Sequence, residues 1–340
     1  MTLTKKVGYA VVGLGHISEH AILPAFRYAK SSRLAAVVSG DARKAARLAK
    51  KFHAPSHYTY DAFDQCLGDP GVEAIYIATL NSAHLEYTLR AAAAGKHVLC
   101  EKPLANTVEE ARQMVAACRH RGVKLMTAYR KFFEPAADAM KSLLKSGKLG
   151  KLKLAHTSFT FNLPEENAWH LDRRLAGGGS LPDIGVYCIN TIRWLTGLEP
   201  TEAAAYSWTV DPARFAEVEE SMCFLLKFPD GFCVQGSCSF GAAKASFLQI
   251  HGEKGWAALN PAFAYNEERR LFGKIGGKWF ERKFKPIEEF HLELDHLAEC
   301  IRKNHEPEPD GVQGLRDVAV MQAIYDAAAK HQAVPISIPE

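Results

Sequence analysis

The chain has 340 residues, of which 47% are hydrophobic and 24% are charged, and its formal net charge is +4. This composition is typical of a folded globular protein, and the length favours two domains over a single core. No apolar stretch is long enough to span a bilayer, and the mild positive charge does not indicate nucleic-acid binding. We therefore expect neither a membrane nor a nucleic acid as a partner.

The cysteines and histidines do not indicate a metal site. The eight cysteines are scattered without a C-x-x-C pair or zinc-finger spacing, which predicts reduced thiols. His291 and His296 are five residues apart in a segment of helical apolar periodicity, which favours a packed helix over a metal-binding one. The N-terminal run from Val7 to Leu14 lacks a small-residue cleavage pattern and is not interpreted as a signal peptide, so we expect a cytoplasmic protein.

The first predicted element is a buried strand over residues 7–12, followed by a glycine turn and a helix over residues 19–30. The turn has the pattern G-x-G-x-x-S, a variant of the dinucleotide-binding fingerprint in which Ser18 replaces the third glycine. The first glycine allows the tight turn, and the second lets a pyrophosphate approach the backbone at the helix N-terminus. Five turn residues are therefore predicted to contact a dinucleotide: Gly13, Leu14, Gly15, His16 and Ile17.

The end of the second strand, predicted over residues 34–38, indicates which dinucleotide is bound. Enzymes that prefer NAD usually place an acidic residue here to bind the ribose 2′-hydroxyl, whereas this chain has Ser39. A hydroxyl and two nearby cations suit a 2′-phosphate, so NADP is predicted and NAD is the less favoured cofactor. The predicted contacts are Ser39, Gly40, Arg43 and Lys44. Alternatively, Arg43 and Lys44 face solvent while Asp41 binds the ribose.

Two further strand ends carry polar residues. After the strand over residues 74–79, Thr79 and Asn81 are placed to face the nicotinamide half of the cofactor, while His84 either contacts ligand or packs locally. The strand over residues 98–100 runs into Glu101-Lys102-Pro103. Lys and Glu are rarely buried unless they are paired, so this triplet indicates a functional site, with a surface ion pair as the alternative.

A helix over residues 108–121 and a strand over residues 123–128 complete the first half, which ends near Arg130. Strands and helices alternate throughout this half. The pattern predicts an α/β domain over residues 1–130, with a doubly wound parallel sheet of the Rossmann type.

From about Lys151 the pattern changes to alternating polar and apolar residues, and Pro229-Asp230-Gly231 has hairpin-turn chemistry. The predicted strands include those over residues 152–161, 203–209, 220–228, 232–240, 247–251 and 256–259. We expect an α+β domain over residues 131–340 with an open, mostly antiparallel sheet and helices on one face. The other face would serve a homodimer or homotetramer contact, and the last helix, over residues 311–330, is expected to return to the first domain.

The segment from Gly177 to Leu195 combines three glycines with a helix that carries polar residues. Asp183 and Tyr187 are four residues apart and so share one helix face. Apolar residues flank them, which indicates a polar face turned towards a cleft. Alternatively, Ser180-x-x-Asp183 is a capping box, and Asp183 only closes the helix end.

Together, four motifs resemble the Gfo/Idh/MocA oxidoreductase family. They are the G-x-G start, Ala78-Thr79-x-Asn81-x-x-His84, the segment from Ala94 to Pro103 and the segment from Gly177 to Tyr187. The similarity covers nearly the whole chain and is greatest towards the NADP-dependent aldose dehydrogenases and the glucose–fructose oxidoreductase branch. Leu80 departs from the pattern, since a proline is common after the third-strand threonine, and no segment resembles the secretion signal of the periplasmic member.

The resemblance implies hydride transfer from C1 of an aldose, of the glucose or xylose type, to NADP, with a lactone as product. Tyr187 matches the acid/base tyrosine and Lys102 the lysine beside it, while Asp183 would orient the sugar or assist the proton transfer. Which of these three residues takes the proton stays open. Glu101 and Arg130 are further cofactor candidates, and the candidates for holding sugar hydroxyls, with packing or surface positions as alternatives, are Arg130, Trp169, His170 and Arg174.

Three other functions are considered. The same site would serve an enzyme that keeps NADP bound and passes hydride from one sugar to another. It would also reduce a ketosugar or a diol-derived carbonyl by the reverse reaction. A non-catalytic sensor of sugars or nucleotides is the third possibility, and the retained Lys102, Asp183 and Tyr187 argue against it.

Overall fold

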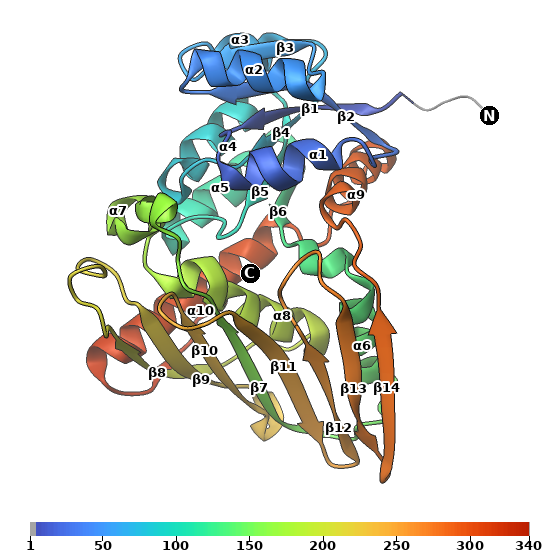
Figure 1. The fold of residues 1–340 in the computed structure, drawn as a ribbon, viewed down its shortest axis with the longest axis vertical. Helices are drawn as coiled ribbons and strands as arrows, with labels where there is room; N and C mark the ends of the chain where they lie inside the picture. Colours follow the sequence, from blue (N-terminus) through green and yellow to red (C-terminus); the bar gives the residue numbers. More distant parts are fainter. Residues whose placement is uncertain (1–4, 340) are drawn as a thin grey trace. The chain divides into compact units, whose positions relative to one another are not determined.

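The computed structural model describes residues 5–339, which form two compact units (Figure 1). The first unit comprises the described residues up to Arg130 together with Glu288–Leu315. The second comprises Lys131–Ile287 and the residues from Arg316 onwards. The sequence suggested that residues 131–340 form one domain, whereas residues 288–315 pack with the first unit.

The first unit contains a six-stranded sheet in which all neighbouring strands are parallel. Its order is β3 (Ser56–Thr59), β2 (Ser32–Ser39), β1 (Val7–Val12), β4 (Ala74–Ile77), β5 (His97–Glu101) and β6 (Leu125–Ala128). Every residue of β1 and β4 is buried, as expected for strands covered on both faces. The predicted Rossmann sheet is confirmed. The strand order reverses between β1 and β4, where such sheets bind ligands.

The helices of this unit are α2 (Ala42–Phe52), α3 (Phe63–Gly68), α4 (His84–Ala93), α5 (Val108–Arg121) and α9 (Phe290–Lys303). α9 explains why residues 288–315 belong here. The hydroxyl of Tyr9 in β1 donates to the carbonyl of Leu294, at 2.8 Å. Asp295 accepts the N–H groups of Lys30 and Ser31. The helix expected to return was α10 (Gly311–Lys330), but most of α10 lies in the second unit.

The helix after the glycine turn is shorter than predicted. Instead of reaching residue 30, it consists of a π-helical stretch, η1 (Ser18–Ile22), followed by α1 (Leu23–Ala25). Pro24 has no N–H and its ring crowds the carbonyl four residues earlier. The wider π turn, in which the N–H of Leu23 bonds to the Ser18 carbonyl, precedes the proline and changes the register there.

The second unit contains a nine-stranded sheet, and it confirms the predicted mostly antiparallel arrangement. Its order is β14 (Lys278–Phe284), β13 (Arg269–Ile275), β12 (Gly255–Asn260), β11 (Ala245–Gly252), β7 (Leu152–Thr160), β10 (Cys233–Ser239), β9 (Ser221–Lys227), β8 (Glu202–Trp208) and β15 (Val334–Pro335). Strands β7 and β10 are parallel, and the other neighbouring pairs described are antiparallel. The turn between β9 and β10 is at the predicted Pro229–Gly231, where Asp230 has a φ of 63°.

Helices cover one face of this sheet (Figure 1). They are α6 (Pro135–Lys145), α8 (Val186–Thr196) and the second-unit part of α10. Shorter helical segments are η2 (Asn81–Ala83), η3 (Arg130–Phe133), η4 (Glu165–Leu171), α7 (Arg173–Ala176), η5 (Leu181–Gly185) and η6 (Pro229–Gly231). α8 carries the segment that sequence analysis linked to chemistry.

Two properties of the described residues bear on function class. No helix within residues 5–339 has the length and apolar character needed to cross a membrane. All eight cysteines are free, which agrees with the predicted reduced thiols.

Candidate active site

The glycine turn after β1 has the geometry that a dinucleotide site requires. Gly13 has a φ of +89°, and a Cβ there would lie 2.3 Å from the carbonyl oxygen of Ala78, so the position demands glycine. An added Cβ at Gly15 would have no heavy atom within 4 Å, which leaves the backbone open to an approaching group. Ser18 is buried, and its hydroxyl donates to the Gly13 carbonyl at 2.6 Å. The turn fits the pyrophosphate of a dinucleotide.

At the end of β2, Asp41 is the N-cap of α2. Its Oδ1 accepts the N–H groups of Lys44, at 3.1 Å, and Arg43, at 2.8 Å, and these bonds hold the pKa of Asp41 below its usual range. The carboxylate is thus engaged by the helix end, while the side chain of Arg43 is exposed and that of Lys44 is half-buried. This arrangement favours the predicted 2′-phosphate contacts over binding of the ribose by Asp41.

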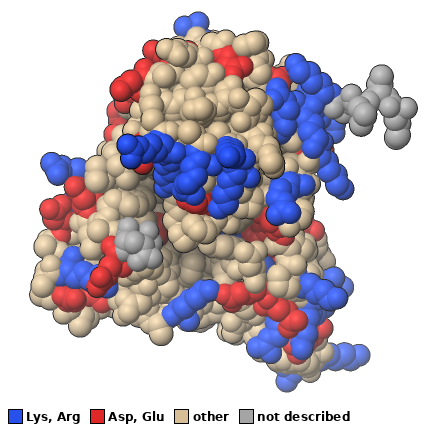
Figure 2. All heavy atoms as spheres, turned by 45° about the horizontal axis from the view of Figure 1, so that its top comes forward, with Lys and Arg blue, Asp and Glu red and all other residues tan. Residues whose placement is uncertain are grey.

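The surface near this strand end is basic. Figure 2 shows Lys and Arg side chains gathered on one face. Five basic residues lie on α2: Arg43, Lys44, Arg47, Lys50 and Lys51. Arg47 and Lys51 pair with Glu19, at 3.0 and 3.6 Å, so these two cations are partly neutralised.

Glu101 and Lys102 follow β5, and Glu101 is tied into the unit rather than forming a surface ion pair. Its Oε1 accepts the hydroxyl of Tyr76 at 2.7 Å, and its Oε2 accepts the N–H of Lys102 at 3.2 Å. Burial raises the pKa of the Glu101 carboxyl, and the charge of Lys102 opposes that rise. Lys102 itself is half-buried. The alternative of a simple surface ion pair is therefore not favoured.

His84 is fully buried, which favours the local-packing alternative over contact with ligand. Its Nδ1 lies 3.0 Å from the carbonyl of Pro103 and 3.3 Å from that of Leu104, so the N–H at Nδ1 donates to this turn. Burial lowers the pKa of His84 to about 4, and the neutral ring matches a donor role at Nδ1. These contacts indicate that His84 stabilises the turn that carries Lys102.

Three other predicted residues of the first unit are accounted for. Arg130 is buried, and its Nη1 lies 2.7 Å from Oε2 of Glu289, at the start of α9. Asn81 is buried at the start of η2, and the half-buried Thr79 donates to the Leu80 carbonyl at 3.3 Å. Their cofactor and sugar contacts remain predictions.

In the second unit, Asp183 lies in η5 and Tyr187 in the first turn of α8, which continues η5 directly. The Tyr187 ring packs against Phe159 and Phe263, with ring centroids 5.8 and 6.1 Å apart, and 7% of the residue is exposed. Neither phenylalanine was predicted, since single aromatics, here Phe159 on β7 and Phe263 between β12 and β13, have no distinctive spacing. They form an apolar wall beside the predicted acid/base.

Three predicted sugar-binding residues lie together. The Oδ2 atom of Asp183 is 3.8 Å from Nε2 of His170, and the His170 ring lies 3.7 Å from the ring of Trp169. Arg174 instead has a highly exposed side chain that pairs with Asp172, the N-cap of α7. An acid, an imidazole and an indole side by side match the groups that bind sugar hydroxyls and sugar rings.

The capping-box alternative for Ser180 and Asp183 is wrong. The Ser180 side chain makes no cap hydrogen bond, and its hydroxyl donates to Sγ of Cys238 at 3.4 Å. The N–H groups of Gly179 and Leu181 are instead bound by Glu219, a residue that sequence analysis missed. Further along α8, Asn190 is buried and donates to Asp317 at 2.7 Å, so its side chain faces α10.

Comparison with known families covers both units. Residues 7–129 match the oxidoreductase family with an NAD-binding Rossmann fold, and residues 137–258 match the Gfo/Idh/MocA C-terminal domain. The chain belongs to the Gfo/Idh/MocA oxidoreductase family.

Individual relatives align along nearly the full length. The D-xylose 1-dehydrogenase [NADP(+)] of Haloarcula marismortui is 31% identical, over 96% of this chain and 92% of its own. A mouse trans-1,2-dihydrobenzene-1,2-diol dehydrogenase is also 31% identical, over 91% of this chain and 90% of its own. Among solved structures, the aldose-aldose oxidoreductase of Caulobacter crescentus, complexed with glycerol, superposes with a TM-score of 0.94. It is 38% identical, over 98% of this chain and all of its own.

Proposed function

We propose that this protein is an NADP-dependent dehydrogenase that oxidises an aldose, of the glucose or xylose type, at C1 to the lactone. The observation that carries the proposal is the near-full-length similarity to an aldose-aldose oxidoreductase, together with the retained Lys102, Asp183 and Tyr187. The similarity to an NADP-dependent xylose dehydrogenase supports the same substrate class and cofactor.

The first unit fits NADP by its own geometry. The open backbone at Gly15 would receive the pyrophosphate, and Arg43 and Lys44 would bind the 2′-phosphate. When bound, NADP supplies the nicotinamide carbon that accepts a hydride.

Residues of the chain itself would accept the proton that the sugar loses. Oxidation breaks the C1–H bond of the sugar, and the 1-hydroxyl must lose its proton as the carbonyl forms. We assign that proton to the oxygen of Tyr187 in its phenolate form, which becomes the neutral hydroxyl as it accepts the proton. We assign the Lys102 ammonium to stabilisation of the phenolate and of developing alkoxide charge, and Asp183 to orientation of the sugar. His170, which lies beside Asp183, and Trp169, whose ring lies against that of His170, are assigned to the sugar hydroxyls and ring face.

A second candidate is an enzyme that retains NADP and transfers hydride from one aldose to another sugar. The aldose-aldose oxidoreductase supports it, as this relative is 38% identical. The two functions use the same residues and differ in whether the cofactor leaves after each cycle.

The test is NADPH fluorescence after mixing the purified protein with NADP and a panel of aldoses, with NAD in parallel. Steady accumulation of NADPH identifies a releasing dehydrogenase and its substrate. Reduction that stops near one equivalent per subunit, and resumes when a second sugar is added, identifies hydride transfer between sugars. No reduction with any aldose and either cofactor contradicts both.

Two finer features belong to the proposal. The eight free cysteines support a reducing compartment, and we assign the protein to the cytoplasm. The sheet face of the second unit that lacks helices supports self-association into a homodimer or homotetramer. Large apolar side chains on this sheet are exposed, among them Leu154, Tyr206, Trp208, Leu225, Phe247 and Trp279.

A further inference from the structure

Two of the three glycines before η5, Gly178 and Gly179, pass close to residues that the proposed chemistry does not use. A Cβ at Gly178 would lie 1.9 Å from the hydroxyl oxygen of Tyr325 on α10, and one at Gly179 would lie 1.9 Å from the carbonyl oxygen of Glu219. Only glycine permits the main chain to pass at these distances. The segment is therefore held against both residues.

Glu219 binds three successive N–H groups of this segment. Its Oε2 accepts from Gly179 and its Oε1 from Leu181, each at 2.9 Å, while its carbonyl accepts from Ser180 at 3.4 Å. Leu181 is the first residue of η5, whose N-terminal N–H groups would otherwise lack partners. Glu219 thus caps η5 from another part of the chain, in the place that the Ser180 side chain does not take.

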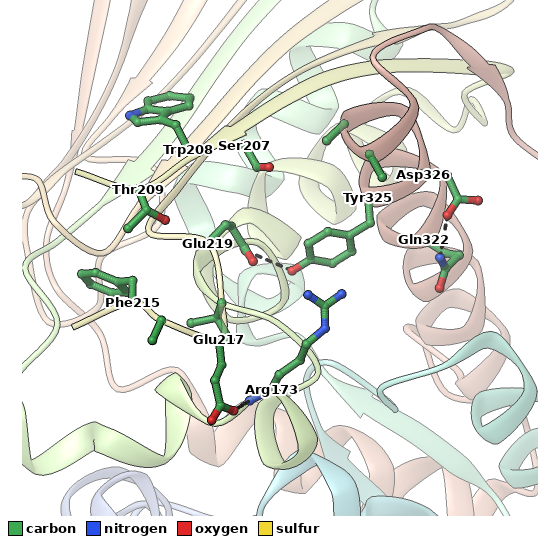
Figure 3. Close-up of a pocket in the computed structure, with 14 residues that line it drawn as sticks. Arg173, Ser207, Trp208, Thr209, Phe215, Glu217, Glu219, Gln322, Tyr325 and Asp326 are labelled. Carbon is green, nitrogen blue, oxygen red and sulfur yellow. Dashed lines mark hydrogen bonds between the residues drawn. The ribbon is translucent and has the colours of Figure 1, made fainter. Parts of the chain in front are cut away.

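Tyr325 fixes the carboxylate in turn. Its hydroxyl donates to Oε1 of Glu219 at 3.0 Å, and Figure 3 shows the two side chains pointing toward one another. Both residues line a cavity of about 480 Å³, together with Arg173 and Glu217. The Arg173 guanidinium lies 6.0 Å from the centre of the Tyr325 ring. Burial raises the pKa of Glu219, and its N–H donors oppose that rise.

The N-terminal cap of η5 is close in sequence to Asp183, which is proposed to orient the sugar. Asp183 is two residues beyond Leu181, in the five-residue η5, and its Oδ2 lies 3.8 Å from His170. Gly185, at the end of η5, is confined as well, because a Cβ there would lie 2.9 Å from Sγ of Cys238. A displacement at Leu181 would therefore move Asp183. Tyr187 lies on α8, which is held separately by the contacts of Asn190 and Arg193 with Asp317.

We propose that Glu219, held by Tyr325, is a positioning residue that fixes the main chain at residues 179–181 and thereby places Asp183 for the sugar. This role rests on the proposed aldose oxidation. It predicts that Glu219 acts through Asp183 and does not touch the cofactor.

The kinetic test is a double-mutant cycle with Glu219→Gln and Asp183→Asn. Glutamine keeps the size of the side chain but replaces one acceptor oxygen with an amide that faces an N–H donor. We expect Glu219→Gln to lower kcat for the aldose about 10- to 100-fold, the scale of a misplacement near 1 Å, with NADPH affinity unchanged. In the Asp183→Asn background the same change should have little further effect. Tyr325→Phe should give a smaller loss in the same direction.

The matched control is Asp326→Asn, which lines the same cavity and bonds to Gln322 but does not contact the glycine segment. It should leave kcat unchanged. Additive losses from Glu219→Gln and Asp183→Asn, or an equal loss in Asp326→Asn, would overturn the positioning role.

Amide hydrogen exchange separates this role from the proposed function. Peptides covering residues 177–185 should exchange faster in Glu219→Gln than in the native protein, with exchange in α5 unchanged. This result does not depend on any substrate. If the native protein oxidises no aldose, the proposed function fails while exchange still reports on the cap. Unchanged exchange at residues 177–185 would overturn the cap.

Discussion

At the residue scale, a single proton distinguishes the folded and unfolded states of His84. The ring is fully buried in the native protein, where burial lowers its pKa to about 4 from an ordinary value of 6.5. Between these pH values the unfolded chain binds a proton that the folded chain does not. Stability therefore rises with pH across this window and falls as pH is lowered from 6.5 towards 4.

This difference predicts a pH-dependent effect of His84→Asn. The variant has no titrating ring, so its deficit in unfolding free energy should shrink as pH falls from 6.5 to 4, by about 3 kcal/mol at most. Urea unfolding at intervals across that range measures it. A deficit that stays constant with pH would show that His84 titrates normally in the folded protein.

Tyr187→Phe removes the proposed proton acceptor and leaves the ring between Phe159 and Phe263. We expect turnover of the aldose to fall at least about 10²-fold, the usual lower range for loss of a general acid or base. NADPH binding, measured by fluorescence titration, should be unaffected. Tyr206→Phe, at an exposed tyrosine of β8, is the control. Native turnover in the Tyr187→Phe variant would refute the assignment.

Arg43→Ala tests the cofactor preference. A charge-assisted hydrogen bond to the 2′-phosphate contributes about 1.5–3 kcal/mol, and 1.4 kcal/mol corresponds to tenfold in affinity. The KM for NADP should therefore rise about tenfold or more, with little change for NAD. Lys50→Ala, an exposed cation on the same helix, is the matched control. Equal increases in the KM for NADP and for NAD would mean that Arg43 does not bind the 2′-phosphate.

At the element scale, α8 is attached to α10 by a buried ionic network. Asp317 is fully buried and accepts from Asn190 and Arg193 of α8, and Arg193 also pairs with Glu199 at 2.6 Å. Because Asp317→Ala removes a carboxylate that faces a buried guanidinium, we expect a loss of about 3–5 kcal/mol in unfolding free energy. Denaturant titration measures the loss, and Asp326→Ala, also on α10, should cost under about 0.5 kcal/mol. Similar losses in the two variants would argue against the network.

Elements with strong local signals were predictable to the residue. α5 spans residues 108–121 as predicted, because Thr107 and Glu110 form a capping box and Gly122 ends the helix with a φ of +65°. β13 and β14 were missed. β14 reads Lys-Trp-Phe-Glu-Arg-Lys-Phe and has an exposed, charged outer edge with little apolar alternation. The attachment of residues 288–315 to the first unit was also missed, since it depends on contacts such as Tyr9 to Leu294.

The candidate site likewise contains some residues that the sequence predicted and others that it did not. Asp183 lies in the predicted motif over residues 177–187, whereas Trp169 and His170 were candidates with packing or surface positions as alternatives. The structure places Asp183 near His170 and the His170 ring against that of Trp169. Glu219 and Tyr325 gave no such signal, because they lie far along the chain from the glycines they hold. In the sequence, the glycines at 178 and 179 were the sign of a close approach, and the residues that approach them, Tyr325 and Glu219, are identified only in the folded unit.

At the scale of the whole molecule, the sheet of the second unit has one face without helices (Figure 1). On that face the cross-strand register aligns Leu154, His251, Trp256, Lys274 and Trp279 across β7, β11, β12, β13 and β14. The rings of Trp256 and Trp279 meet edge to face at 5.9 Å, and Trp279 is 59% exposed. Leu154 and Trp279 in this row are exposed apolar side chains, and together with the other exposed apolar side chains of the sheet they indicate an interaction surface.

A second copy of this chain is the partner that we predict for this face, because an isologous contact pairs a surface with itself and closes at two subunits. Trp279→Glu places a charge in the aligned row and should convert a dimer or tetramer to smaller species, as measured by sedimentation equilibrium over a range of concentrations. Tyr28→Glu, at an exposed aromatic of the first unit, should leave the mass unchanged. A native protein with the mass of a monomer at all concentrations would contradict the prediction. A multimer that Trp279→Glu leaves intact would place the contact on another surface.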